Sequence, residues 1–234
     1  MKAGIIAAGE GSRLKSEGIS LPKPLVPVNG IPLIEHCIRS FAKCGITEIV
    51  CIINEYSPEV RRFLEERGFE IPITVMVKTT PSSMHSLFAL APSLKEGQFL
   101  LSTVDSIFDD NELSRFLTSS KARSSADGVL AVTKFVDDEN PLYVHVDGAN
   151  RIESFSKSGA SPWITGGLYV FSPRIFDEVD AALAQGIERL RNFLGHLLKS
   201  GYTLEAFPFS KIVDVDHASD LRVAEEFLRA GNLN

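Results

Sequence analysis

Two glycines and two cations near the N-terminus form a pattern suited to phosphate chemistry. Gly9 and Gly11 follow an apolar run, residues 2–8, which predicts a buried first strand. A glycine turn after the first strand of an open α/β sheet is a place where phosphate binds, because glycine lets the backbone approach a ligand closely. Arg13 and Lys23 follow the turn, and prolines on both sides of the lysine restrict its backbone. We interpret the stretch as a nucleoside triphosphate site.

Three common phosphate motifs do not fit this stretch. The dinucleotide fingerprint needs a third glycine where this chain has Leu14. The P-loop needs Gly-Lys followed by Ser or Thr, protein kinases need the HRD and DFG motifs, and the sequence contains none of these. The pattern therefore predicts a different way of holding the triphosphate.

Acidic residues at two strand ends are the candidate metal ligands. Asp105 follows the apolar run 99–104, and a carboxylate at the end of an interior parallel strand faces the ligand crevice. The residue type alone fits either a magnesium ligand or the N-cap of the next helix, and the cap is the more common role. Asp214 and Asp216 are two apart on a predicted strand, so both can face one cation. Magnesium prefers one or two carboxylates with phosphate oxygens, which Asp105 and one of this pair supply.

The chain resembles the sugar-phosphate nucleotidyltransferase family in two stretches, AAGEGSRL (7–14) and PKPLVPVNGIPLIEH (22–36). The resemblance implies an enzyme that transfers a nucleoside monophosphate from a nucleoside triphosphate to a sugar 1-phosphate and releases pyrophosphate. It gives Arg13 and Lys23 catalytic roles. The planar guanidinium of Arg13 binds two phosphate oxygens, and the ammonium of Lys23 places a point charge at the phosphates. The nucleotide contacts that it implies are Ala8, Gly9, Gly11, Ser12, Arg13, Lys23 and Ser83.

The same resemblance assigns a metal site and an acceptor site. It makes Asp105 a ligand of Mg²⁺, although the family usually has glycine at the place of Val104. The second ligand comes from the Asp-Val-Asp segment. The family's motif here ends in Asp-Leu, and aligning that ending with the Asp-Leu pair of this chain favours Asp216 over Asp214. Lys157 lies where the family often has Glu-Lys-Pro, and here serines flank it. The acceptor contacts implied are Lys157, Thr165 and Gly167.

The order of strand-like and helix-like segments predicts the fold. They alternate up to Phe135, which indicates a three-layer α/β/α Rossmann-like fold with a doubly wound, mostly parallel mixed sheet. A more antiparallel part follows, with strand-like runs at 142–146, 151–156 and 164–171. The helical stretch 173–200 is expected to break at Gly186.

Length and composition limit the classes of protein. The 234 residues suffice for one domain, with a nucleotide-binding lobe of about residues 1–135 and an acceptor-binding lobe of about residues 136–234. A net charge of −6 argues against non-specific nucleic acid binding, and no stretch is long and apolar enough to span a membrane. The odd cysteine count without a CxxC motif indicates free thiols, so we expect a cytoplasmic protein with buried Cys37, Cys44 and Cys51.

Other functions stay open at this point. Phosphocholine is a second candidate acceptor, since short single-domain proteins of the family also use it. The fold can also serve as a catalytically inactive nucleotide-binding regulatory module. A metal-dependent glycosyltransferase would use an Asp-X-Asp pair as well, but with a nucleotide sugar as donor. Pyrophosphate release from a triphosphate separates the transferase from the last two. The sequence leaves the nucleotide base and the oligomeric state undetermined.

Overall fold

Parallel strands from the N-terminal half form one side of the central sheet. The computed structural model describes residues 1–123, 125–136, 139–159 and 161–231. The strands are β1 (Lys2–Ala7), β4 (Glu48–Ile53), β5 (Ile73–Val77) and β6 (Phe99–Thr103). β1 lies between β4 and β6, with Ile5 opposite Cys51 on one side and Ser102 on the other. This position explains the continuous apolar run of β1, because a strand flanked on both edges and both faces is buried.

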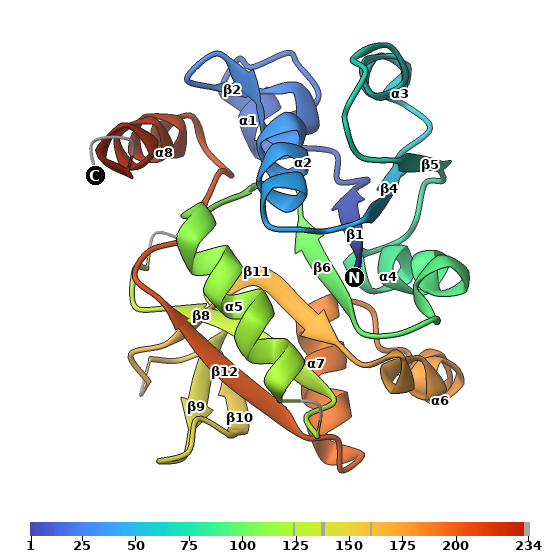
Figure 1. The fold of residues 1–234 in the computed structure, drawn as a ribbon, viewed down its shortest axis with the longest axis vertical. Helices are drawn as coiled ribbons and strands as arrows, with labels where there is room; N and C mark the ends of the chain where they lie inside the picture. Colours follow the sequence, from blue (N-terminus) through green and yellow to red (C-terminus); the bar gives the residue numbers. More distant parts are fainter. Residues whose placement is uncertain (124, 137–138, 160, 232–234) are drawn as a thin grey trace.

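Strands from the C-terminal half extend the sheet in mixed orientation. They are β8 (Gly128–Thr133), β9 (Tyr143–Val146), β10 (Ile152–Ser156), β11 (Ile164–Phe171) and β12 (Leu204–Phe209). β11 runs antiparallel to both β6 and β8, and β12 runs parallel to β8. The order is β10-β9-β11-β6-β1-β4-β5, with β8 and β12 attached beside β11 (Figure 1). The predicted change to antiparallel pairing after Phe135 is confirmed.

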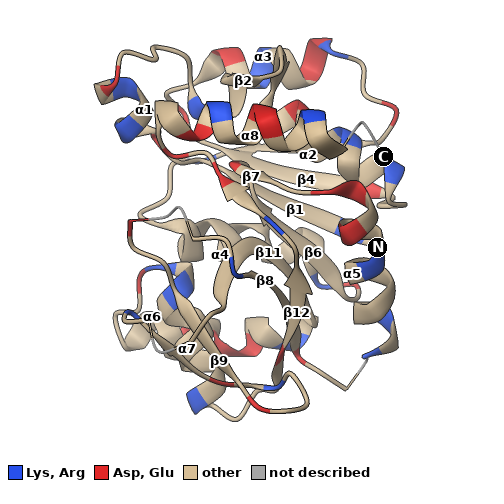
Figure 2. Ribbon diagram, turned by 90° about the vertical axis from the view of Figure 1, so that its left-hand side faces the viewer, with Lys and Arg blue, Asp and Glu red and all other residues tan. Residues whose placement is uncertain are grey.

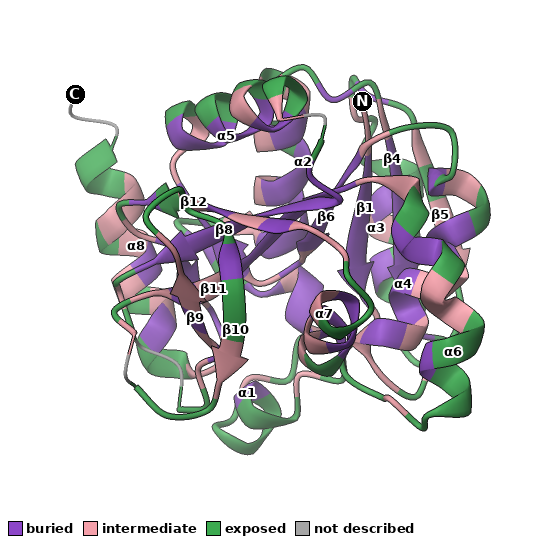
Figure 3. Cartoon of the chain, turned by 90° about the horizontal axis from the view of Figure 1, so that it is seen from below, coloured by how far each residue is buried: buried purple, intermediate pink, exposed green. Residues whose placement is uncertain are grey.

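Helices cover both faces of the sheet, because alternate strand residues point to opposite sides. Ile5 belongs to an apolar cluster with residues of α2 (Leu33–Lys43), α3 (Pro58–Glu66) and α5 (Asp110–Ala122). Ile6 packs with α4 (Ser83–Leu94) and α7 (Leu190–Lys199). β1, β4 and β6 are buried between these layers (Figure 3), and charged segments are concentrated on the helices and loops (Figure 2). The three-layer α/β/α fold class is confirmed.

Several short elements were not predicted from the sequence. They are α1 (Ser12–Ser16), the 3₁₀ turn η1 (Lys23–Leu25), β2 (Pro27–Val28), β3 (Ile31–Pro32) and β7 (Ser106–Ile107). A separate apolar cluster joins α1, β2 and β7 to β13 (Val213–Asp214) and α8 (Ala218–Gly231). Its members include Leu14, Ile107 and Val215, from three distant parts of the sequence. These contacts bring the N-terminal signature, the segment after β6 and the Asp-Val-Asp segment together.

The region 173–200 is broken, as expected, but at more than one place. It forms η2 (Pro173–Glu178), α6 (Val179–Ala184) and then α7, and Gly186 has φ of 65° between the last two.

The cysteines are free, and Cys37 and Cys51 are buried as expected. The expected burial of Cys44 is wrong, because this residue lies at the C-cap of α2 and is only half-buried. No helix in the described ranges is long and apolar enough to cross a bilayer.

Candidate active site

The two halves of the N-terminal signature pack directly against each other. Gly11 precedes α1 with φ of 61° and ψ of 36°, a left-handed conformation that glycine adopts without strain. A Cβ atom at Gly11 would lie 2.9 Å from the Cβ of Lys23. Glycine is therefore required here both for the turn and for the close approach of the lysine.

Lys23 is the centre of the site. Its side chain is 8% exposed, and its Nζ lies 2.6 Å from Oδ2 of Asp105 and 2.6 Å from Oδ1 of Asp216. Burial alone would lower the pKa of Lys23, but the two carboxylates outweigh burial and hold that pKa above its usual range. The ammonium in turn holds the pKa of Asp105 below its usual range, although burial of this carboxyl acts in the opposite direction. Lys23 and Asp105 are therefore both charged at neutral pH.

Arg13 completes the same cluster. Its Nη1 lies 2.6 Å from Oδ2 of Asp216, so this carboxylate accepts from two cations. Glu17 follows on the same loop and accepts from His217 Nδ1 at 2.6 Å and from the backbone N–H of Ala218 at 2.6 Å. These bonds fix the loop against the segment that carries Asp216, and sequence reasoning missed Glu17 because nothing local indicates its distant partners.

Asp214 has a different environment from Asp216. Ser106 Oγ donates to its Oδ1 at 2.8 Å, across the short pair β7–β13. Burial, and then the nearby charge of Asp105, raises the pKa of Asp214 to about 8. Asp214 is therefore protonated at neutral pH, whereas Asp105 and Asp216 share the Lys23 ammonium. The strand ends at Asp214, so the expected strand geometry does not extend to Asp216.

A cavity of about 420 Å³ collects several expected residues. Asp105, Asp214 and Asp216 line it together with Ser83, Thr165 and Gly167. Ser83 accepts from the backbone N–H of Leu190 at 3.2 Å, which docks the start of α7 on the start of α4. Gly167 has a packing reason as well, because a Cβ there would lie 2.2 Å from Ser106 Oγ. The cavity therefore joins the metal, nucleotide and acceptor residues expected from the sequence.

A neighbouring cavity of about 590 Å³ holds the remaining cations. Arg13 and Lys157 line it, with Asp216 at the border that the two cavities share. Arg189 and Arg191 line both cavities, and sequence reasoning missed them because no motif in the helical stretch 173–200 marks a site. The expected nucleotide residues that line neither cavity are Ala8, Gly9, Gly11, Ser12 and Lys23, although Lys23 contacts Asp105 and Asp216, which do.

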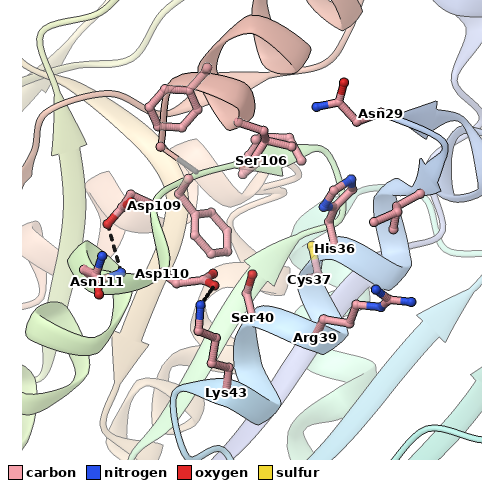
Figure 4. A pocket seen from close by; sticks show the side chains of 16 residues that line it. Asn29, His36, Cys37, Arg39, Ser40, Lys43, Ser106, Asp109, Asp110 and Asn111 are labelled. Carbon is pink, nitrogen blue, oxygen red and sulfur yellow. Dashed lines mark hydrogen bonds and ion pairs between the residues drawn. The ribbon is translucent and has the colours of Figure 1, made fainter. Parts of the chain in front are cut away.

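Another hollow, of about 400 Å³, lies between α2, α5, α8 and β7 (Figure 4). Lys43 Nζ donates to Asp110 Oδ2 at 2.8 Å within it, and Asp109 caps α5 through the backbone N–H of Asn111 at 2.9 Å. Of the described residues that line it, none is an expected catalytic, nucleotide, acceptor or metal residue. The chemistry expected from the sequence belongs to the other two cavities.

The chain is similar to known proteins over most of its length. The nucleotidyl transferase family profile matches residues 2–231. Mannose-1-phosphate guanylyltransferase 1 of Arabidopsis thaliana is 32% identical over 193 residues, covering 77% of this chain and 52% of that protein. Mannose-1-phosphate guanyltransferase of Yarrowia lipolytica is 29% identical over 194 residues, with the same coverage of 77% and 52%. The chain thus spans about half the length of the curated relatives that it matches.

A solved structure has the same fold. The inositol-1-phosphate CTP transferase from T. maritima superposes with a TM-score of 0.81, covering 96% of this chain and 93% of that chain. The sequence identity is 24%, so this likeness concerns the arrangement of the chain.

Proposed function

Because the chain belongs to the nucleotidyl transferase family, we propose that it transfers a nucleoside monophosphate from a nucleoside triphosphate to a sugar 1-phosphate. The observation that carries the proposal is the position of Lys23, buried at the glycine turn and in contact with Asp105 and Asp216. Phosphate-binding cations, acidic groups and two adjoining cavities meet at this point. The names of the relatives support a phosphorylated acceptor, since they act on mannose 1-phosphate and inositol 1-phosphate.

The reaction is an in-line displacement at the α-phosphorus. A phosphate oxygen of the acceptor forms a bond to this phosphorus, while the bond to the bridging oxygen breaks and pyrophosphate leaves with the electron pair. Arg13, exposed on α1, can bind two phosphate oxygens through its planar guanidinium. Lys23 acts as a point charge that stabilises the charge developing on the phosphates. The glycine turn lets the backbone of residues 9–11 approach the triphosphate.

Magnesium is proposed as the cofactor. Within the described ranges, no group of three or more His, Cys, Asp or Glu side chains is arranged as a metal site. The donors present nevertheless fit magnesium, because Asp105 and Asp216 offer carboxylate oxygens around a single cation, the ammonium of Lys23. Burial, and then the negative charge of Asp105, raises the pKa of the neighbouring Asp214. Magnesium would be held by Asp105 and Asp216 and would neutralise charge on the phosphates.

Phosphocholine is a weaker candidate acceptor. Lys157, Arg189 and Arg191 line the cavity where the acceptor would lie, and their charges repel a trimethylammonium group. A sugar 1-phosphate carries no such cation and matches the charge of the cavity.

The experiment is a pyrophosphate-release assay with each nucleoside triphosphate and a panel of sugar 1-phosphates in the presence of magnesium. We expect release that requires both substrates. Release without an acceptor, or none with any pair, would contradict the transferase and favour a nucleotide-binding module. Lys15, an exposed cation on α1, supplies the control variant Lys15→Ala, which should keep wild-type turnover.

A further inference from the structure

The first turn of α7 presents two arginines to the acceptor side of the site. Arg189 and Arg191 flank Leu190, whose backbone N–H donates to Ser83 Oγ at 3.2 Å. Ser82 Oγ donates to the backbone carbonyl of Glu188 at 3.4 Å. The turn is therefore fixed against the start of α4, and both arginine side chains lie at the junction of the two cavities.

These arginines differ from the other cations of the site in having no carboxylate partner. Arg13 and Lys23 are bound to Asp216 and Asp105. Within the part of the chain that the structure describes, no carboxylate lies within ion-pair distance of Arg189, Arg191 or Lys157. Arg191 Nη1 donates instead to the backbone carbonyl of Asn140 at 2.8 Å, which holds it beside the cavity.

The acidic residues of the same cavity have partners elsewhere. Asp216 accepts from Arg13 and Lys23, and Glu139 lies 3.6 Å from His217 Nε2. Three cations, Lys157, Arg189 and Arg191, are left to face a ligand in a cavity of about 590 Å³. A phosphate monoester carries a charge of about −2 at most at neutral pH, whereas these three cations are additional to Arg13, which is paired with Asp216. The positive charge on the side chains of this cavity is thus larger than is required to neutralise the phosphate that is transferred.

We propose that Arg189 and Arg191 bind a second acidic group of the acceptor, a carboxylate or a second phosphate, while Lys157 binds the phosphate that is transferred. The inference rests on the proposed function, whose acceptor it narrows to phosphorylated sugars or polyols with an additional negative charge. A guanidinium binds either group through two parallel hydrogen bonds, and two arginines on one turn can bind it from two sides.

The test is calorimetric binding of three ligands that share one phosphate: glucose 1-phosphate, glucuronic acid 1-phosphate and glucose 1,6-bisphosphate. The first two differ only in a hydroxymethyl group and a carboxylate, and the third supplies a second phosphate. We expect the wild-type protein to bind one of the two charged ligands at least about tenfold more tightly than glucose 1-phosphate, as a charged hydrogen-bonded pair provides. The ligand that shows the preference identifies the acidic group.

The variant Arg189→Gln/Arg191→Gln should lose this preference and bind glucose 1-phosphate like the wild type. Lys199→Gln, at the exposed end of the same helix, is the matched control and should keep the preference. Circular dichroism of each variant verifies the fold. Equal binding of the three ligands by the wild type, binding of none, or an equal loss for all three in the arginine variant would overturn the proposal. In the last case the arginines bind the shared phosphate.

Failure of the proposed function gives a different result. Calorimetry measures binding and needs no turnover. If the protein prefers the charged ligand but releases no pyrophosphate, the transferase activity is contradicted, while the proposed site for an acidic group is still supported. Turnover of sugar 1-phosphates without any preference contradicts the acidic-group site and leaves the transferase.

Discussion

Lys23 and Asp216 are 193 residues apart in the sequence, and Nζ of the lysine lies 2.6 Å from Oδ1 of the aspartate. The same ammonium lies 2.6 Å from Oδ2 of Asp105, at the end of β6. One buried cation therefore joins the N-terminal signature, the centre of the sheet and the segment before α8. The two carboxylates would repel each other without it, so the lysine stabilises the arrangement of the site as well as any phosphate bound there.

Lys23→Ala should lower turnover by about a hundredfold or more while the protein still folds, because the lost charge acts mainly on the transition state. Pyrophosphate release gives the turnover, and circular dichroism reports the fold. The melting temperature should fall, because Asp105 and Asp216 then face each other without the ammonium. Lys15→Ala, which removes an exposed cation on α1, is the control. Near wild-type turnover of Lys23→Ala with the best acceptor would remove the role assigned to Lys23.

Gly11→Ala should destabilise the protein by about 1–3 kcal/mol, because the left-handed backbone disfavours a side chain and the added Cβ meets Lys23. Turnover should fall as well, since the lysine has to move. Gly97→Ala is the matched control, because a Cβ there meets nothing within 4 Å and the backbone is not left-handed. Denaturant unfolding of both variants tests this prediction, and equal stability of the two would contradict it.

Asp214→Asn should lower turnover much less than Asp216→Asn does. Asp214 has a pKa raised to about 8 in the folded protein, so its carboxyl is already neutral at pH 7. A raised pKa in an acid means that the folded state binds more protons, so wild-type stability falls between about pH 4 and pH 8. Asparagine removes this dependence. Melting curves in EDTA across this range measure it, and parallel curves for the variant and the wild type would contradict the assignment.

Glu35→Gln tests a buried ion pair outside the site. Glu35 on α2 is 2% exposed and accepts from Arg67 at 2.8 and 3.1 Å and also from Arg39. The bonds from Arg67 hold the pKa of Glu35 below its usual range, although burial acts against them. The stabilisation is therefore present at neutral pH and is lost as the pH falls through the folded-state pKa, below about pH 4.

We expect Glu35→Gln to lower the free energy of unfolding by about 2 kcal/mol at pH 7, with a smaller difference from the wild type at pH 3. Glu65→Gln breaks an exposed pair with Arg61 on α3 and is the control, with an effect near zero. A difference between Glu35→Gln and the wild type that does not shrink on acidification would show that the charge of Glu35 is not what stabilises this contact.

The strands were the most predictable part of the fold, because their signal is local. The run expected at 164–171 matches β11 residue for residue, since it is rich in β-branched and aromatic residues and Ser172 follows it. The short elements α1 and β7 were not predicted, because five and two residues carry no periodic pattern. They form only through contacts with α8 and β13, far away in the sequence.

The candidate site was predictable where a motif marks a residue, and not where tertiary contacts decide. Arg13, Lys23, Asp105 and Asp216 were named from the signature and the strand ends, and the structure brings them together. Arg189 and Glu17 were missed, because their roles depend on contacts across 107 residues between Ser83 and Leu190 and across 200 residues between Glu17 and His217. Sequence spacing gives no measure of such contacts.

The most direct test of the account is the magnesium dependence of pyrophosphate release by the wild type, Asp105→Ala, Asp216→Ala and the double variant. If Asp105 and Asp216 hold one magnesium ion at the triphosphate, each single variant should lose about a hundredfold or more of the turnover. The double variant should lose little beyond either single one, because the two residues act through the same ion. EDTA should abolish wild-type turnover. Activity that persists in EDTA, or an Asp105→Ala enzyme with unchanged magnesium dependence, would contradict the account.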